Sequence, residues 1–418
     1  MMTCQMSNKK WYCKKSTEDE LGRVGIEFKN EYINIYFPHG YRLPKEEDIN
    51  AQREAVIDLL NTMSLTKDID EKGYLREKNG DISGFPVNSY LWLLNDYINN
   101  GLFNIREKVY IQSQKGKINW KRTFSTTPIF SEQGAVYLNP YVEKNTKIDN
   151  IITEIHAYCI NDCIEQIGWL FGNIEKVDYK ILNFNKELYL NVLNEELKKT
   201  FNDRVKTMLN NMIVIIKNKF NNNKTEMIDD ILTLNYHYAW EKMIDKVYGN
   251  DSIENYRPEL SWNNLPEKVP NPHMRPDTIN IDKSKRELFI IDSKYYKYGI
   301  IRGGKLPGAE DIDKQITYGD YCSDSKNFIE PIEYDTDKIY NAFILPYNKE
   351  DNRFNYCDNV KFIGFAESKA RTGRERITHK RVALILMDTK YLIDCYLLKQ
   401  NKKCNELLDS IRCVLKNK

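Results

Sequence analysis

The chain has 418 residues, of which 41% are hydrophobic and 29% charged, so it is long enough for two or three domains with buried cores. Its formal net charge is only +2, which excludes a uniformly basic protein that coats nucleic acid. No apolar run approaches the ~20 residues that cross a bilayer, residues 1–15 lack the apolar centre of a secretory signal, and the nine cysteines form no CxxC pair. We therefore expect a cytoplasmic protein with reduced thiols, no membrane contact and no zinc site.

Residues 1–147 are predicted to form a β-rich N-terminal region that engages a partner or DNA. Glu31 to Phe37 alternates apolar and polar side chains, as a half-buried strand does. Helical spacing predicts two helices, at Glu46–Met63 and Tyr90–Leu102, the second ending near Gly101. Lys115 and Gly116 separate two β-prone runs, so a hairpin is expected at Tyr110–Arg122.

Residues 148–224 are expected to form a helical connector. One helical face collects Ile151, Ile155, Cys159 and Ile167, and Leu188–Phe220 contains few helix breakers. The asparagine-rich residues 221–224 mark the boundary to the third region, residues 225–418. There a helix at Thr225–Tyr248 precedes strands that alternate with helices, which indicates an α/β unit. Its later elements are predicted at Ile339–Leu345 and Val382–Met387 (strands) and Tyr391–Leu398 (helix). The fold class is therefore α+β multidomain, with a mixed central sheet in the C-terminal part.

Two predicted strands of this last region carry charged residues at their shared end. Arg275–Asp282 and Glu287–Lys294 flank a turn centred on residues 284–285, so residues whose numbers sum to 569 lie opposite each other. This register places Asp277 opposite Asp292, with Cβ atoms ~5 Å apart, and the period of two brings Lys294 to the same face. That face continues as core through Ile279, Ile281, Leu288 and Ile290. A shift of one residue in register would destroy the arrangement.

This triad has the chemistry of a metal-dependent hydrolase. Two carboxylates held together repel each other, and a divalent cation removes the conflict. Magnesium prefers one or two carboxylates, waters and substrate phosphate oxygens. An adjacent lysine orients the attacking water or, as the neutral amine, deprotonates it, and as the ammonium it neutralises charge on the phosphate. We therefore predict one or two Mg²⁺ ions held by Asp277 and Asp292, with Lys294 positioning the water that attacks a phosphate ester. The simpler alternative is an exposed hairpin end with solvated charges.

Pro276-Asp277 followed by Asp292-Ser293-Lys294 resembles the PD-(D/E)xK nuclease motif. The resemblance implies an α/β nuclease core in which Glu241, on the preceding helix, is a third acidic metal ligand, and Gln315, on the following helix, lies beside the site. Helical spacing places Asp311, Gln315 and Tyr318 on one face of that helix and leaves Ile312 and Ile316 for the core. Ordinary surface positions for Glu241 and Gln315 remain the alternative.

A narrower resemblance is carried by Asp292–Tyr296, Leu306–Gly308 and Asp311–Gln315, which look like the LlaJI-type restriction endonucleases, relatives of the nuclease subunits of McrBC-like systems. Gly116–Thr123 is similar to a segment that these proteins carry upstream. The resemblance implies a bacterial restriction or anti-phage endonuclease that acts on double-stranded DNA with an AAA-type, McrB-like GTPase or ATPase subunit. No GxxxxGK[ST] loop occurs in the sequence, so any NTP hydrolysis must come from another chain.

Basic residues gather near the C-terminus. From Lys361 to Lys418 there are 14 Lys and Arg against 6 Asp and Glu, a net of +8. The predicted phosphate contacts in this part are Arg371, Arg374, Arg376 and Lys380, and Arg122 is a further candidate for DNA or partner contact. A solvated surface face accounts for the same charges equally well.

Three other functions stay open from the sequence. The chain fits a self-sufficient type II restriction enzyme whose N-terminal half reads bases, a non-cutting subunit that binds and stimulates an NTPase, or a repair or junction nuclease. Metal-dependent cleavage by the purified chain excludes the pure binder. A panel of sequence-bearing and branched duplexes separates restriction from repair.

Overall fold

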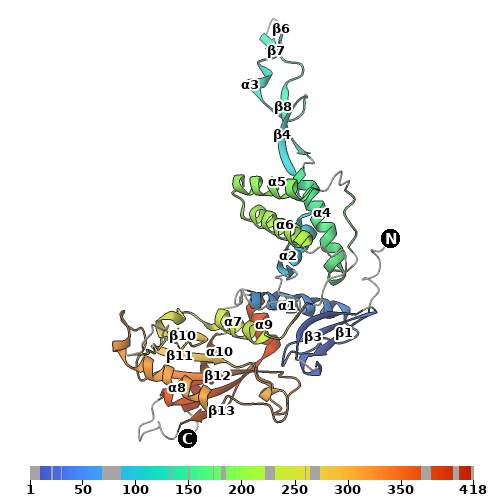
Figure 1. Cartoon of the computed structure of the whole chain (residues 1–418). Helices are drawn as coiled ribbons and strands as arrows, with labels where there is room; N and C mark the ends of the chain where they lie inside the picture. The colour runs from blue at the N-terminus through green and yellow to red at the C-terminus, as the bar shows by residue number, and fades with distance from the viewer. Residues whose placement is uncertain are drawn as a thin grey trace. The chain divides into compact units, whose positions relative to one another are not determined.

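The structure is a computed structural model that describes residues 10–19, 22–29, 31–67, 86–131, 134–148, 151–172, 174–179, 185–221, 231–258, 260–263, 274–368, 378–398 and 404–415. These residues form a mixed α and β structure with several sheets (Figure 1). They divide into two compact units. We call Pro86–Met227 the insert unit, and Ser7–Phe85 together with Ile228–Lys418 the sheet unit. None of the described helices is both long enough and apolar enough to cross a membrane.

The sheet unit begins with a four-stranded sheet in the order β1-β3-β2-β9. Its strands are β1 (Lys10–Lys15), β2 (Val24–Phe28), β3 (Tyr32–Phe37) and β9 (Ile231–Thr233), and α1 (Ile49–Lys67) packs beside β2. β9 pairs antiparallel with β2, with Val24 opposite Thr233. The N-terminal strands therefore fold with the C-terminal half of the chain, unlike the three consecutive regions expected from the sequence. A pairing across about two hundred residues leaves no local sequence signal.

A five-stranded mixed sheet forms the centre of the sheet unit, in the order β10-β11-β12-β14-β13. Its strands are β10 (Thr278–Asp282), β11 (Glu287–Ser293), β12 (Ile339–Tyr347), β13 (Val360–Glu367) and β14 (Arg381–Asp388). β11, β12 and β14 are parallel, and β10 and β13 run antiparallel to their neighbours. Every residue of β11 and β12 is buried, as expected for central strands covered on both faces.

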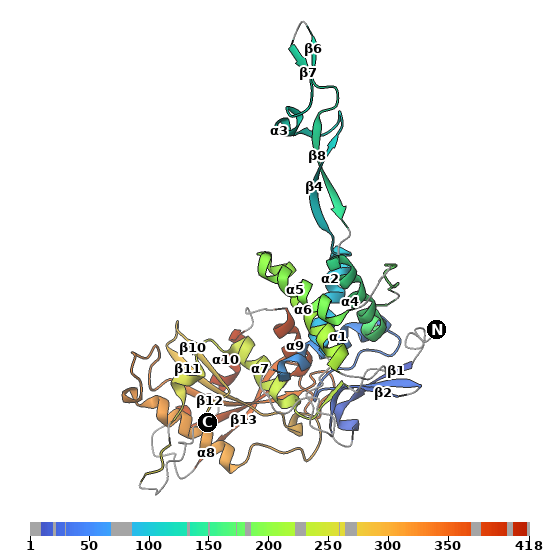
Figure 2. The same ribbon diagram turned by 45° about the horizontal axis from the view of Figure 1, so that its top comes forward.

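Four helices cover this sheet: α7 (Tyr236–Tyr248), α8 (Ala309–Ser323), α9 (Thr389–Leu397) and α10 (Cys404–Arg412). α8 lies on one face and α7 and α10 on the other (Figures 1 and 2). The strands predicted at Ile339 and Val382 and the helix predicted at Tyr391 are confirmed. The helix predicted from Thr225 is wrong at its start, because residues 231–233 form β9 and α7 begins only at Tyr236.

The hairpin of β10 and β11 has the predicted register. Thr278 lies opposite Ile291 and Asp282 opposite Glu287, so the paired numbers sum to 569. The predicted core face is confirmed as well, because the same apolar cluster buries Ile279, Ile281, Leu288 and Ile290 together with Tyr318 and Cys322 of α8. Continued by one residue, this register brings Asp277 level with Asp292 at the open end of the hairpin.

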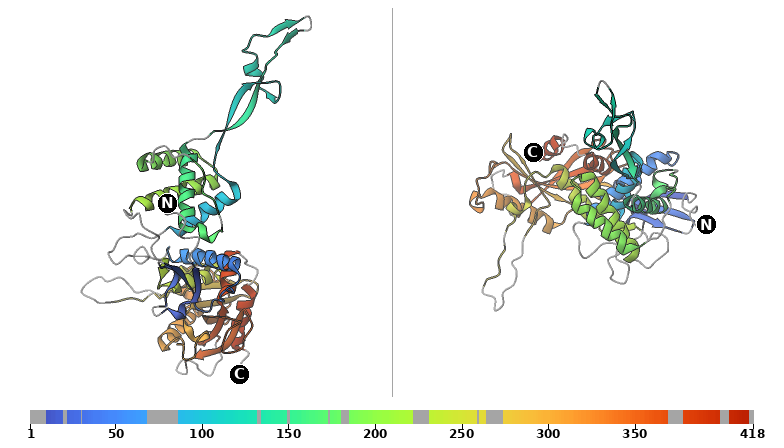
Figure 3. Two further views of the ribbon diagram at one scale, coloured as in Figure 1. Left: turned by 90° about the vertical axis from the view of Figure 1, so that its right-hand side faces the viewer. Right: turned by 90° about the horizontal axis from the view of Figure 1, so that it is seen from above.

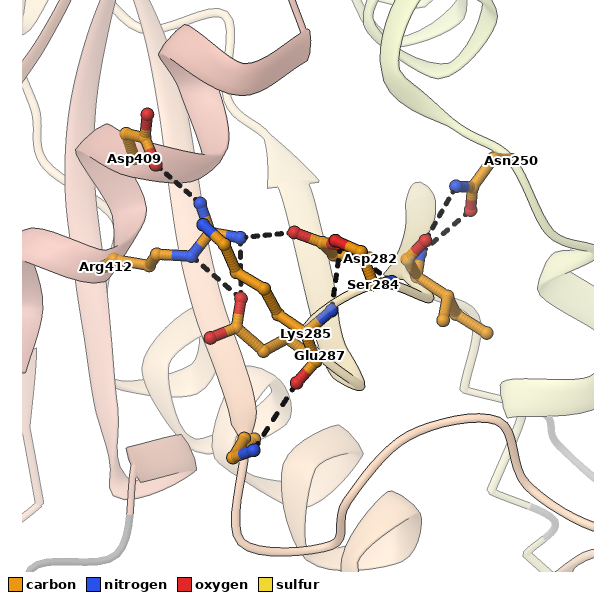
Figure 4. A network of polar contacts seen from close by, with 9 residues as sticks. Asn250, Asp282, Ser284, Lys285, Glu287, Asp409 and Arg412 are labelled. Atoms are coloured by element: carbon orange, nitrogen blue, oxygen red, sulfur yellow. Dashed lines mark hydrogen bonds and ion pairs between the residues drawn. The ribbon is translucent and has the colours of Figure 1, made fainter.

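Polar contacts hold the turn end of this hairpin (Figure 4). The Arg412 guanidinium of α10 donates to Glu287 Oε2 (2.8 Å), Asp282 Oδ2 (2.7 Å) and Asp409 Oδ1 (2.6 Å). On the other side, Asn250 Nδ2 donates to the Ile281 carbonyl (3.0 Å) and its Oδ1 accepts from the Ile281 N–H (2.8 Å). Since a one-residue slip would turn every side chain to the opposite face, these contacts also stabilise the arrangement at the far end of the strands.

The insert unit combines a helical part with a long β-ribbon (Figure 3). Its helices are α2 (Val87–Asn100), α3 (Trp120–Thr123), α4 (Ile151–Ile167), α5 (Lys186–Lys199) and α6 (Asp203–Asn221). Its strands are β4 (Ile105–Gln112), β5 (Lys117–Ile118), β6 (Ile129–Ser131), β7 (Gly134–Val136) and β8 (Tyr141–Ile148). β8 pairs with both β4 and β5, and β6 pairs with β7.

The structure corrects two predictions within the insert unit. The hairpin predicted at Tyr110–Arg122 is wrong, because β8 lies between β4 and β5 in the sheet. The turn signal at Lys115-Gly116 is real, but the pairing partner comes from about twenty residues further along the chain. The long helix predicted at Leu188–Phe220 is divided into α5 and α6 at residues 200–202. The helices predicted from Ile151 and Tyr90 are confirmed, and α2 ends at Gly101 with φ +73°.

Candidate active site

Three carboxyl groups gather where β10 begins and β11 ends. Asp277 directly precedes β10, and its Oδ2 accepts a hydrogen bond from the Ser293 N–H of β11 (2.7 Å). Asp292 lies in β11 with only 3% of its surface exposed. Glu241 lies on α7, which packs against both strands. Burial and the charges of Asp277 and Asp292 raise the pKa of Glu241 to about 8, and burial and Asp292 raise the pKa of Asp277. The site therefore favours binding positive charge, either protons or a cation.

Lys294 is held in place between two acids. Its Nζ lies 2.8 Å from Asp292 Oδ2 and 2.8 Å from Asp311 Oδ1. Asp311 stands in the first turn of α8, where its other oxygen accepts from the Gly308 N–H (3.0 Å). Burial works to lower the pKa of Lys294, but the two carboxylates outweigh it and raise that pKa well above its usual range. Lys294 is therefore a fixed ammonium at neutral pH, which favours charge stabilisation and water orientation over proton abstraction.

Gln315 is fully buried under β11, and not an exposed amide. Its Nε2 donates to the Ile290 carbonyl (2.8 Å) and reaches Asn341 Oδ1 of β12 (3.5 Å). Asn341 Nδ2 in turn donates to the His379 carbonyl (2.7 Å). Gln315 therefore ties α8 to the strand that carries Asp292, two residues beyond the bonded carbonyl. The predicted helical face is present, with Tyr318 buried as well and Ile316 in the core.

The carboxyl groups fit a magnesium ion by their chemistry. Among the residues that the structure describes, no three His, Cys, Asp or Glu side chains are already arranged as a ligand set. One oxygen of Asp292 is instead ion-paired with Lys294. Magnesium needs only one or two carboxylates, completed by water and phosphate oxygens. Burial raises the pKa values of Glu241 and Asp277 most, and neighbouring carboxylates raise them further; a divalent cation would relieve that repulsion.

The predicted DNA contacts have different surroundings. Lys380 is ion-paired with Asp320 of α8, which also bonds His379 Nε2 (2.9 Å), and its side chain is only 14% exposed. Asp320 follows Asp311 by nine residues, about 14 Å along the helix, so the Lys380–Asp320 pair lies well beyond the Lys294–Asp311 pair on α8. Arg122 belongs to the insert unit, where its exposed guanidinium stacks 4.2 Å from the centre of the Tyr110 ring. Arg371, Arg374 and Arg376 lie outside the described residues.

Two charged residues of the site were not chosen from the sequence. Asp311 was assigned to the correct helical face but not recognised as the second anion on Lys294. The charge of Lys314 opposes the rise in the pKa of both Glu241 and Asp277, so this ammonium also faces the cluster. Helical spacing was the available signal, since residues 311, 314 and 315 share one face at i, i+3 and i+4.

The N-terminal part of the sheet unit supports the strand end. Tyr295, next to Lys294, stacks on His39 with ring centres 4.5 Å apart, and its hydroxyl accepts from the His39 N–H (2.6 Å). Burial lowers the pKa of His39 to about 4, and its Nδ1 lies 2.8 Å from Ser16 Oγ. His39 is therefore a neutral packing residue.

No curated protein matches this chain. One similar solved structure is a refined half-complex from a tetradecameric assembly of Thermococcus gammatolerans McrB AAA+ hexamers with bound McrC, at 12% identity and a TM-score of 0.35, covering 90% of this chain and 82% of that one. Another is the Thermococcus gammatolerans McrBC complex, at 15% identity and a TM-score of 0.22, covering 53% and 64%. These superpositions are too loose to support an argument about fold or partner.

A family model gives the decisive match. The model described as LlaJI restriction endonuclease aligns with residues 24–388, which include β2, β3 and the carboxyl cluster. This confirms the resemblance first drawn from the short runs around Asp292, Gly308 and Gln315. The match extends over most of the 418 residues, and the chain belongs to the LlaJI restriction endonuclease family.

Proposed function

We propose that this chain is a Mg²⁺-dependent endonuclease that hydrolyses a phosphodiester bond of double-stranded DNA. One observation carries the proposal: at the end of β11, three carboxyl groups meet a fixed ammonium group, and burial together with neighbouring carboxylate charge raises the pKa values of Glu241 and Asp277. Membership of a restriction endonuclease family supports DNA as the substrate and a restriction or anti-phage role as the setting.

The residues divide into metal-holding and charge-stabilising groups. Asp277 and Asp292 would hold magnesium, with Glu241 as a third oxygen donor. When bound there, the ion would lower the pKa of a coordinated water and polarise the phosphate. The Lys294 ammonium orients the attacking water and offsets negative charge that builds on the phosphate. Asp311 keeps Lys294 at that spot, and it is a positioning residue.

We assign the surrounding sheet to the PD-(D/E)xK type. In support, the two acids lie at the shared end of an antiparallel hairpin, β10 and β11, and Lys294 follows Asp292 by two residues. A helix that carries an acid, α7, precedes the hairpin, and the helix that carries Gln315 follows it. This order of elements is what the motif implied from the sequence.

We further propose that cutting depends on an NTPase partner of the McrB class. The sequence contains no nucleotide-binding GxxxxGK[ST] loop. The insert unit exposes several large apolar side chains beyond β4, which are Trp120 (53%), Phe124 (62%), Ile129 (54%), Phe130 (80%) and Leu138 (57%). Trp120 packs on Phe124, with ring centres 5.5 Å apart, but both rings remain exposed enough to contact a second protein. Exposed apolar groups of this kind mark interaction surfaces.

Cleavage assays test both the Mg²⁺ dependence and the dependence on an NTPase partner. The purified chain is incubated with plasmid DNA in Mg²⁺ or in EDTA, with and without a candidate NTPase and GTP or ATP. We expect cleavage only in Mg²⁺, and regulated cutting only with the partner and its nucleotide. Cleavage in excess EDTA would refute the metal mechanism. Efficient site-specific cutting by the isolated chain would refute the partner and leave a self-sufficient restriction enzyme.

A further inference from the structure

The segment between β11 and α8 lies at the edge of the candidate active site. It runs from Tyr295 to Gly308 and contains one short 3-10 helix, η4 (Lys297–Gly299). Lys294 immediately precedes the segment and Asp311 stands just beyond it, and these two residues are ion-paired at 2.8 Å. Both ends of this segment, which we call the connecting loop, therefore lie beside the Lys294–Asp311 ion pair.

All charged residues of the connecting loop are basic. It carries Lys297, Arg302 and Lys305, and no Asp or Glu occurs between residues 295 and 308. Arg302 and Lys305 are exposed. Within the described part of the chain, neither side chain has an ion pair or hydrogen bond. Of the acids nearest along the chain, Asp292 and Asp311 are bonded to Lys294, and Glu310 is exposed in the first turn of α8. The positive charge of the loop is therefore available to a ligand.

The backbone of the loop is preformed. The Ile300 and Ile301 N–H groups both donate to the Lys297 carbonyl (3.0 Å each), and the Gly304 N–H donates to the Ile301 carbonyl (3.3 Å). Gly304 packs so closely that a Cβ there would lie 2.6 Å from the carbonyl group of Lys297, which leaves room for glycine only. Gly303 adopts φ +76°, which completes a tight turn with Arg302 near its tip. A preformed turn loses little conformational entropy when it binds.

We propose that Arg302 and Lys305 of the connecting loop contact backbone phosphates of DNA beside the cleaved bond. The inference rests on the proposed function, since it takes DNA as the substrate of the neighbouring carboxyl cluster. Phosphate contacts position the duplex without reading its bases, so this loop contributes affinity that is independent of sequence. Each contact releases condensed counterions, which makes the contribution dependent on salt.

The test compares matched variants of the full-length chain. Arg302→Ala/Lys305→Ala removes the two charges. The control, Lys283→Ala/Lys285→Ala, removes two charges at the turn of the β10–β11 hairpin, about 20 Å away at the other end of β11. A second variant, Arg302→Lys/Lys305→Arg, keeps both charges. All four side chains are exposed, so every variant is expected to fold.

Binding to a short labelled duplex is measured in EDTA over a range of salt concentrations, for several DNA sequences. Two lost contacts should reduce the slope of log affinity against log salt by about 1.8 for the alanine variant, similarly for every sequence. The control and the charge-keeping variant should retain the wild-type slope. As a second readout, the cleavage rate is measured in Mg²⁺ at limiting DNA. For the alanine variant, this rate should depend less steeply on salt concentration than it does for wild type.

The outcomes separate the two proposals. If wild type cuts DNA but the alanine variant keeps its salt slope, or the control loses as much, the loop contact is overturned and the proposed function stands. If wild type neither binds nor cuts DNA, both are overturned. A flattened slope confined to the alanine variant supports the loop contact.

Discussion

The ionisation of Glu241 links the electrostatics of the site to a measurable quantity, the pH dependence of the free energy of unfolding. Burial, with the charges of Asp277 and Asp292, raises the pKa of Glu241 from 4.5 to about 8. Between these pH values the folded chain holds a proton that the unfolded chain has released. Because the folded state binds more protons in this window, the free energy of unfolding falls as the pH rises from the unfolded pKa toward the folded one.

The size of this change in the free energy of unfolding follows from the one proton that Glu241 binds. The slope is about 1.4 kcal/mol per pH unit while only the folded state is protonated, so Glu241 lowers the wild-type free energy of unfolding by about 2.5 kcal/mol between about pH 5.5 and pH 7.5. Glu241→Gln resembles the protonated carboxyl in shape but cannot ionise, so it should lack this part of the pH dependence. Mg²⁺ should weaken the pH dependence of the wild-type free energy of unfolding, because the cation offsets the repulsion among the carboxylates.

Urea unfolding in EDTA at the two pH values measures this effect as the difference in pH dependence between wild type and Glu241→Gln. Glu310→Gln, which changes an exposed acid in the first turn of α8, is the matched control and should follow wild type. Parallel pH dependences for wild type and Glu241→Gln would refute the electrostatic account of the cluster.

Three further predictions concern the residues around the cluster. Asp311→Asn should reduce cleavage by about 10- to 100-fold, because it removes one of the two anions that fix Lys294; a kcat equal to that of wild type would contradict this positioning role. Gln315→Ala should reduce the free energy of unfolding by about 1–3 kcal/mol, because it leaves the buried Ile290 carbonyl without its donor; denaturation measures it, and a change below about 0.5 kcal/mol would be inconsistent with that bond. Arg412→Ala should destabilise the chain more than Asp409→Ala does, because Arg412 is bonded to both Asp282 and Glu287 whereas Asp409 is exposed; equal losses in thermal unfolding would argue against a clamp on the hairpin.

The parts of the site that the sequence predicted are those that local rules determine. Turn position and the period of two set the β10–β11 register, and with it the proximity of Asp277 and Asp292. Helical spacing gave the correct face of α8. It did not reveal that Gln315 is fully buried, because periodicity gives the direction of a side chain and not its depth.

The parts that escaped prediction depend on contacts between distant segments. No local pattern announces that β9 pairs with β2, that β8 separates β5 from β4, or that His39 packs on Tyr295. The ion pair of Lys294 with Asp311 likewise requires the position of α8 against the sheet, which sequence spacing does not supply. The ion pair of Lys380 with Asp320 of α8 also joins distant segments, and the phosphate contact expected for Lys380 stays a prediction.

Cleavage by site variants in Mg²⁺ tests the central claim most directly. Wild type, Asp292→Asn, Lys294→Ala and the control Glu310→Gln are compared on the same plasmid, with the NTPase partner present if wild type requires it. We predict that Asp292→Asn and Lys294→Ala lose cleavage while retaining the fold and DNA binding, and that Glu310→Gln cuts like wild type. Cleavage by either site variant at a rate close to that of wild type would contradict the assignment of Asp277, Asp292 and Lys294 as the catalytic centre.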